Sequence, residues 1–75
     1  MIKVEVRLFA YFREGRWKKK VIEFKEGTTL SDIINCLGIK EEEVSMLLLN
    51  GIDGPASRQL KDGDVVSLFP PVGGG

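Results

Sequence analysis

The chain has 75 residues and a mass of 8.3 kDa, which is enough for one domain with one hydrophobic core. It carries 11 basic and 11 acidic residues, so no net charge draws it to nucleic acid or to a membrane surface. The single cysteine, Cys36, excludes an internal disulfide framework and a four-cysteine zinc or iron–sulfur site, and it fits a reducing cytoplasm.

The first predicted element is a strand. Apolar and charged side chains alternate through residues 2–9, which is the period of a strand with one buried face. The same alternation argues against a signal peptide or a membrane span in this segment. Residues 10–19 have room for a short helical turn, and residues 20–25 resume the alternation. The two extended segments therefore predict a hairpin.

An amphipathic helix is predicted after Gly27. Four apolar residues share one helical stripe: Leu30, Ile33, Ile34 and Leu37. Thr29 is the expected N-cap, and Asp32 has the spacing of the acid in a capping box. Gly38 supplies a left-handed stop. The helix is therefore expected to be short and to lie across a sheet.

The second half of the chain predicts two more strands. Residues 46–49 form a brief apolar run closed by the turn sequence Asn50-Gly51, and residues 64–69 form another run that ends at Pro70-Pro71. Residues 54–61 are expected to be irregular. The order strand, strand, helix, strand, strand predicts an α+β domain with one main helix packed on one face of a mixed sheet.

The usual catalytic groupings are absent from the sequence. Without histidine there is no Ser-His or Cys-His pair, and no glycine-rich phosphate loop joins a strand to a helix. The acidic run at residues 41–43 is interpreted as a solvated turn. Cys36 lies near the end of the predicted helix, where the dipole disfavours a thiolate, and we interpret it as a small residue bordering the apolar stripe. The chain is therefore not expected to be catalytic alone or to bind a metal.

A basic stretch surrounds Trp17. Its members are Arg13, Arg16, Lys18, Lys19 and Lys20. Three interpretations are open: a solvated loop with Trp17 partly packed, a docking patch for another protein, or a phosphate-binding surface for nucleic acid with an aromatic platform. We favour the solvated loop.

The sequence ends on FPPVGGG, residues 69–75. Glycines have no side chains to bury, so this segment is either idle or recognised by another protein. A backbone without Cβ atoms fits a slot too narrow for other residues, and it would carry the α-carboxylate of Gly75 into a partner. Pro71 keeps the residue before it extended, so Pro70-Pro71 is expected to direct the tail away from the sheet.

Alternation along the last strand predicts a contact surface beside the tail. If Val66 and Leu68 face the helix, the residues between and beyond them face the opposite side. Phe69 would then be a docking anchor, worth about 2 kcal/mol as a hot spot. The alternative is that Phe69 is a core residue at the edge of the sheet.

Several segments resemble the ubiquitin-like sulfur carriers of the MoaD and ThiS type, above all the small subunit of molybdopterin synthase. The similar segments are VRLFA at residues 6–10, GTTL at 27–30, LKDGDVV at 60–66, FPPV at 69–72 and the closing Gly74-Gly75. The chain departs from the family in having Gly73 before that pair. The resemblance implies a ubiquitin-like β-grasp domain over residues 1–72 and a flexible glycine tail over residues 73–75.

The resemblance also implies a mode of action. An adenylating enzyme of the ubiquitin-activating, MoeB type would use ATP to activate the Gly75 carboxylate, and sulfur would replace the adenylate as a thiocarboxylate. Gly73 and Gly74, which lack side chains, would let the tail pass through a narrow slot in the partner. The large subunit of molybdopterin synthase, of the MoaE type, would receive the sulfur, and the chain itself would bind no cofactor. Contacts with partners are expected from the residues before the glycines: Phe69, Pro70, Pro71 and Val72.

Related proteins with the same ending leave other functions open. Sulfur carriers for thiamine and for transfer-RNA thiolation end on Gly-Gly, as do small modifiers that join their terminus to lysine. A β-grasp module that binds nucleic acid or acts as a scaffold is a further alternative. The sequence FPPV favours the molybdopterin member.

Overall fold

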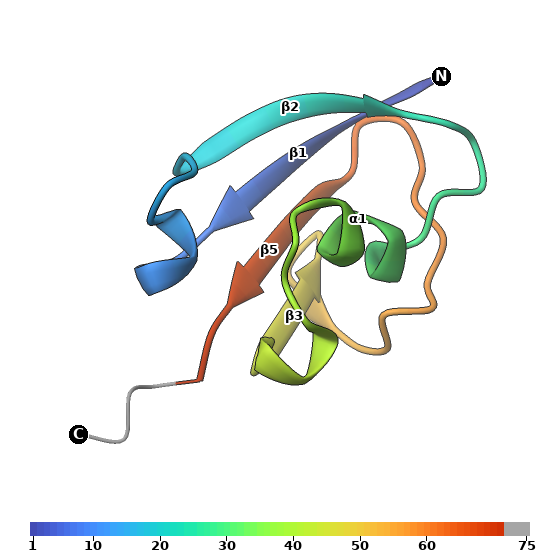
Figure 1. Cartoon of the computed structure of the whole chain (residues 1–75). Coiled ribbons are helices and arrows are strands. Elements are labelled where there is room, and N and C mark those ends of the chain that lie inside the picture. The colour runs from blue at the N-terminus through green and yellow to red at the C-terminus, as the bar shows by residue number, and fades with distance from the viewer. Residues whose placement is uncertain (72–75) are drawn as a thin grey trace.

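A five-stranded mixed sheet is the main element of the structure, a computed structural model that describes residues 1–71 (Figure 1). In chain order the elements are β1 (Ile2–Leu8), the 3-10 helix η1 (Ala10–Arg13), β2 (Lys19–Phe24), α1 (Leu30–Cys36), the 3-10 helix η2 (Glu41–Glu43), β3 (Met46–Leu49), β4 (Ile52–Asp53) and β5 (Val65–Phe69). The strand order is β2-β1-β5-β3-β4. Strands β1 and β5 are parallel, and the other neighbouring pairs are antiparallel.

Strand β1 lies between β2 and β5 and supplies much of the core. Val4, Val6 and Leu8 are fully buried, which confirms the predicted strand with one apolar face. The predicted hairpin with β2 is also confirmed, with Ile2 opposite Phe24 and β2 beginning one residue earlier than expected. Within the connection, η1 is the short helical turn that the sequence allows.

Helix α1 begins and ends as the sequence predicts. The Thr29 side chain accepts a hydrogen bond from the Asp32 N–H (3.2 Å), and an Asp32 carboxylate oxygen accepts one from the Thr29 N–H (3.0 Å). This reciprocal pair is a capping box. Gly38 has φ +75°, as a left-handed stop requires. The interpretation of Cys36 as bordering the apolar stripe is wrong, because its side chain is exposed.

Strands β3 and β4 form a short hairpin that the sequence only half predicts. Asn50 and Gly51 have φ values of +52° and +83°, as expected for a tight hairpin turn with both central residues left-handed. The turn and β3 were predicted, but β4 was not. With two residues, β4 is too short to show alternation, and its pairing with β3 defines it.

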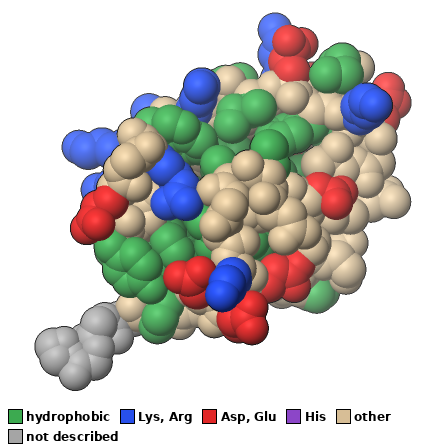
Figure 2. Space-filling model, in the orientation of Figure 1, with side chains coloured by type: hydrophobic (Ala, Val, Ile, Leu, Met, Phe, Trp, Pro, Cys, Tyr) green, Lys and Arg blue, Asp and Glu red, His purple; other side chains and the backbone are tan. Residues whose placement is uncertain are grey.

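One hydrophobic core lies between α1 and one face of the sheet. Its buried members are Ile2, Val4, Val6, Leu8, Phe12, Leu30, Ile33, Ile34, Ile39, Leu47, Leu60, Val66 and Leu68. On the face turned to the viewer in Figure 2, acidic and basic side chains are interspersed among hydrophobic ones. Within residues 1–71, no helix is both long and apolar enough to cross a membrane.

Candidate functional site: the sheet face beside the C-terminal segment

Strand β5 leads directly into the predicted site. Val66 and Leu68 are fully buried in the core, so the side chain of Phe69 projects to the sheet face opposite the helix, where it is half-buried. Pro70 is buried and Pro71 is exposed. Four of the predicted site residues lie outside the described residues: Val72, Gly73, Gly74 and Gly75.

The ring of Phe69 stacks on the ring of Phe9. Their centroids are 4.1 Å apart and the ring planes differ by 10°. The parallel register of β1 and β5 causes this contact, because Leu8 lies opposite Leu68 and the next residue of each strand then projects to the same face. The Phe9 N–H also donates to the Leu68 carbonyl (3.2 Å). Phe69 is therefore neither a core residue nor a free one, but half of an aromatic pair on the outer face.

The apolar surface continues onto β3. Met46 lies opposite Phe69 in the antiparallel pair β3–β5. Met46 is 45% exposed to solvent. We call Phe9, Phe69 and Met46 the apolar row. The Ser45 N–H donates to the Phe69 carbonyl (2.8 Å), so the end of β5 is held against the residue before β3. The row is thus a fixed surface immediately before the C-terminal segment.

The basic stretch around Trp17 divides into two parts with different roles. The Arg16 guanidinium donates to the carbonyls of Phe12 (3.2 Å) and Leu37 (3.0 Å), which ties the loop to the end of α1. Trp17 is partly buried against the core, as the solvated-loop interpretation expected. Lys18 stands apart from these contacts.

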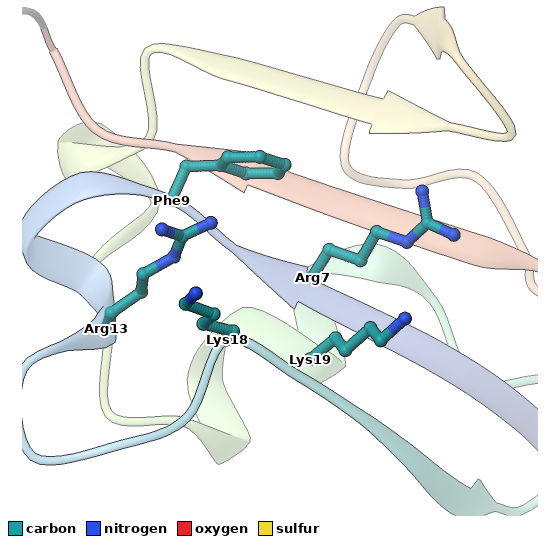
Figure 3. Close-up of a pocket in the computed structure, with 5 residues that line it drawn as sticks. All are labelled: Arg7, Phe9, Arg13, Lys18 and Lys19. Carbon is teal, nitrogen blue, oxygen red and sulfur yellow. The ribbon is translucent and has the colours of Figure 1, made fainter.

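Three other members of the stretch, Arg13, Lys18 and Lys19, line a hollow next to the apolar row (Figure 3), whereas Lys20 is not among its lining residues. Its lining residues are Arg7, Phe9, Arg13, Lys18 and Lys19. They come from the end of β1, from η1 and from the start of β2, which meet at this corner of the sheet. The structure therefore places a cationic hollow and an apolar row side by side.

Sequence reasoning missed Phe9 and Met46 as site residues. Side chains of β1 alternate between the core and the opposite sheet face, and Phe9 follows Arg7 on that opposite face. This alternation could have identified Phe9 from the sequence. Its pairing with Phe69 depends on two strands about 60 positions apart in the chain, and no local pattern encodes that register. The geometry as a whole suits protein binding, since aromatic, methionine and arginine side chains are enriched at interfaces.

Comparisons with known proteins support a common fold and family. The ThiS family profile matches residues 6–75. Small archaeal modifier protein 3 of Haloferax volcanii is 34% identical over 93 aligned positions, which cover 99% of this chain and 100% of that protein.

Two solved structures are similar over their whole length. A protein assigned as molybdopterin converting factor subunit 1, from Pyrococcus furiosus, has a TM-score of 0.77 at 33% identity, covering 96% of this chain and 100% of that one. In a complex of subunits 1 and 2 of molybdopterin-converting factor from Helicobacter pylori, the matching chain has a TM-score of 0.65 at 34% identity, with coverage of 99% and 100%. These similarities confirm the predicted ubiquitin-like β-grasp fold.

Proposed function

This chain belongs to the ThiS family of ubiquitin-like sulfur carriers and modifiers, and we propose that it carries sulfur as a thiocarboxylate on Gly75, as the small subunit of a molybdopterin synthase. The observation that carries the proposal is the family match, which runs through the domain to the final glycine at residue 75. The likeness to molybdopterin converting factor subunit 1 supports the finer assignment.

The chemistry of the terminal carboxylate explains why a partner enzyme is needed. A free α-carboxylate is an anion at neutral pH, and it resists attack by a nucleophile. In the proposed reaction its oxygen attacks the α-phosphorus of ATP and pyrophosphate leaves. Hydrosulfide from a sulfide donor then attacks the carbonyl carbon, AMP leaves with the bonding electrons of the C–O bond, and the S–H proton is lost to solvent. The product is a thiocarboxylate, whose sulfur is itself a nucleophile.

The described residues supply the contact surface for this chemistry. The apolar row offers a partner half-exposed aromatic and thioether side chains beside the C-terminal segment. Gly73 and Gly74, which lack Cβ atoms, are proposed to pass a narrow slot in that partner. Ordering the three terminal glycines costs on the order of 3 to 6 kcal/mol, so binding at the row has to offset that cost.

Two partners follow from the proposal. One is an adenylating enzyme of the ubiquitin-activating type, which uses ATP. The other is the large subunit of molybdopterin synthase, which would accept the sulfur; the complex of subunits 1 and 2 from Helicobacter pylori supports this partner. We place the chain in the cytoplasm, where such enzymes and ATP are available.

A second function is favoured by a specific observation. The similarity to a small archaeal modifier protein, over nearly the whole chain, supports conjugation of Gly75 to a lysine amine. Both functions share the adenylated carboxylate and differ in the nucleophile that replaces AMP. A sulfur carrier for thiamine or for transfer-RNA thiolation would form the same C-terminal thiocarboxylate as the molybdopterin route.

Intact mass spectrometry separates these functions. The chain is incubated with the adenylating enzyme of the same genome, ATP and a sulfide donor. We expect the intact mass of the chain to rise by the difference between one sulfur and one oxygen atom. The mass should not change when ATP is omitted. Transfer of the sulfur to a pterin precursor in the presence of the large subunit would assign the molybdopterin route. A lysine-linked adduct without a thiocarboxylate would instead support the modifier function and contradict sulfur carriage.

A further inference from the structure

Strand β2 forms one edge of the sheet, and within residues 1–71 only β1 pairs with it (Figure 1). The pairing with β1 is continuous from Ile2 opposite Phe24 to Arg7 opposite Lys19. The strand therefore has no bulge, and its sequence contains no proline. Bulges and prolines are common devices that prevent an edge strand from pairing with another chain. The outer side of β2 is thus an uninterrupted edge that can accept a further strand.

The backbone groups on this outer side belong to Lys19, Val21 and Glu23. The Leu8 N–H donates to the Lys18 carbonyl (2.8 Å), which marks these two as a hydrogen-bonded pair of the antiparallel ladder. Because bonded and non-bonded pairs alternate, the even-numbered residues of β2 bond to β1 and the odd-numbered ones direct their N–H and carbonyl groups away from it. No backbone hydrogen bond within residues 1–71 uses these outward groups. Each of the three residues therefore offers one donor and one acceptor to another strand.

The side chains of the same three residues are exposed on the sheet face opposite the helix. Val21 is 59% exposed, although a β-branched side chain gains stability from packing on a sheet. Lys19 lies opposite a like charge, Arg7, and Figure 3 shows the two side chains extending side by side. Neither Lys19 nor Glu23 forms an ion pair within the described residues 1–71. The edge therefore presents a cation, an apolar side chain and an anion, in that order.

This order is complementary to itself when the strand is reversed. In an antiparallel pair related by a two-fold axis, side chains directly opposite one another lie on the same face. When Val21 lies opposite Val21 of a second copy, Lys19 lies opposite Glu23 of that copy, and the outward backbone groups of all three residues are bonded. On the helix side, the methylene stem of Lys20 then covers the partly buried Ile22 of the second copy.

Neighbouring registers lose this match. A shift of the second copy by two residues places Lys19 opposite either Val21 or Lys25 of that copy. Glu23 then lies opposite Trp17 or Val21, and it has no cation opposite it. A shift by one residue directs the side chains to the wrong faces. Charge and backbone pattern therefore select one register.

We propose that two copies of this chain associate edge to edge through β2, in the antiparallel register that places Val21 on the two-fold axis and each Lys19 opposite a Glu23. The product is one continuous sheet with five strands from each copy and both α1 helices on the same face. Strand β1 separates β5 from this edge, so the end of β5 stays accessible in the dimer. One pair of edge strands is a small interface, so the association is weak and reversible. The proposal does not depend on the proposed function.

The test is sedimentation equilibrium of the full chain at about 0.05 to 1 mM, the range in which a small interface is populated. K19E and E23K each convert both opposite-charge contacts into like-charge contacts, so each should weaken self-association about tenfold or more. In an equimolar mixture of K19E and E23K the charges are complementary again. We therefore expect a mixed dimer with about the wild-type affinity.

The matched control is K40E, which makes the same charge change as K19E at an exposed lysine between α1 and η2. Its self-association should stay within about twofold of the wild type. Circular dichroism of all four proteins verifies that each is folded. Backbone amide shifts identify the surface: as the wild-type concentration rises, the N–H signals of Lys19, Val21 and Glu23 should move more than those of Lys20 and Ile22, which bond to β1.

Three results would overturn the proposal. A wild type that is still monomeric at about 1 mM would show that the edge of β2 does not pair with itself. Equal self-association of K19E, E23K and K40E would place the contact on another surface. A mixture of K19E and E23K that associates no better than its separate components would rule out the register.

Discussion

Phe69 shows how one residue can serve both the fold and the proposed function. Its ring is half-buried because it stacks on Phe9, yet it lies on the face that the helix leaves uncovered. The main-chain carbonyl of the same residue is fixed by the Ser45 N–H. A partner that contacts this ring therefore meets a surface that is already ordered, and little rotamer entropy is lost on binding.

The first residue-scale prediction concerns Phe69→Ala. We expect the free energy of binding to the adenylating enzyme to weaken by about 2 kcal/mol, because the variant removes the central side chain of the apolar row. Stability should fall by about 2 kcal/mol, because about 1 kcal/mol for the stacked pair adds to about 1 kcal/mol for the apolar area of a half-buried phenylalanine. Isothermal titration and thermal unfolding measure the two effects separately.

The matched control for Phe69→Ala is Val21→Ala. Val21 is on the same sheet face but on β2, and 59% of it is exposed. Its loss should change neither quantity appreciably. An unchanged affinity in folded Phe69→Ala would reject the anchor.

At the scale of elements, local signals predicted what local interactions determine. The β1 alternation, the Thr29–Asp32 capping box and the Asn50-Gly51 turn each lie within a few residues of sequence, and the structure confirms all three. Strand β4 and the Phe9–Phe69 contact depend on long-range pairing instead. The hollow was missed for the same reason, since β1, η1 and β2 meet there only after the hairpin has formed.

The segment between β4 and β5 contains a contact that its irregular sequence did not predict. The guanidinium of Arg58 donates to three carbonyls, those of Pro55 (2.8 Å), Ile52 (2.8 Å) and Leu47 (3.2 Å). The side chain thereby fastens this segment to β3 and β4. A planar fork with several fixed donors is well suited to this task, whereas an ammonium group is not.

We therefore predict that Arg58→Ala lowers the free energy of unfolding by about 1 to 3 kcal/mol, since three carbonyls lose a charged donor. Arg58→Lys should recover only part of that loss. Urea denaturation of the three proteins provides the measurement. Equal stability of Arg58→Lys and the wild type would show that the charge, and not the fork, is what matters. Adenylation per folded molecule should be the same in all three.

At the scale of the whole molecule, the two faces of the sheet have different tasks. One face buries the core beneath α1, and it was largely predictable because burial follows the strand and helix periods. The other face carries the apolar row and the cationic hollow beside the end of β5. In the proposed function the domain holds and identifies the partner, and the terminal glycines take the reacting carboxylate to it.

The most direct test of this account is ATP–pyrophosphate exchange by the adenylating enzyme with the wild type and with a chain extended by one tryptophan after Gly75. The extension keeps the domain, the apolar row, the hollow and a free carboxylate, but it places a bulky side chain on the reacting residue. We predict that binding is retained and that exchange is lost in the extended chain. Exchange at the wild-type rate would contradict the claim that a terminal glycine carboxylate is what the partner activates.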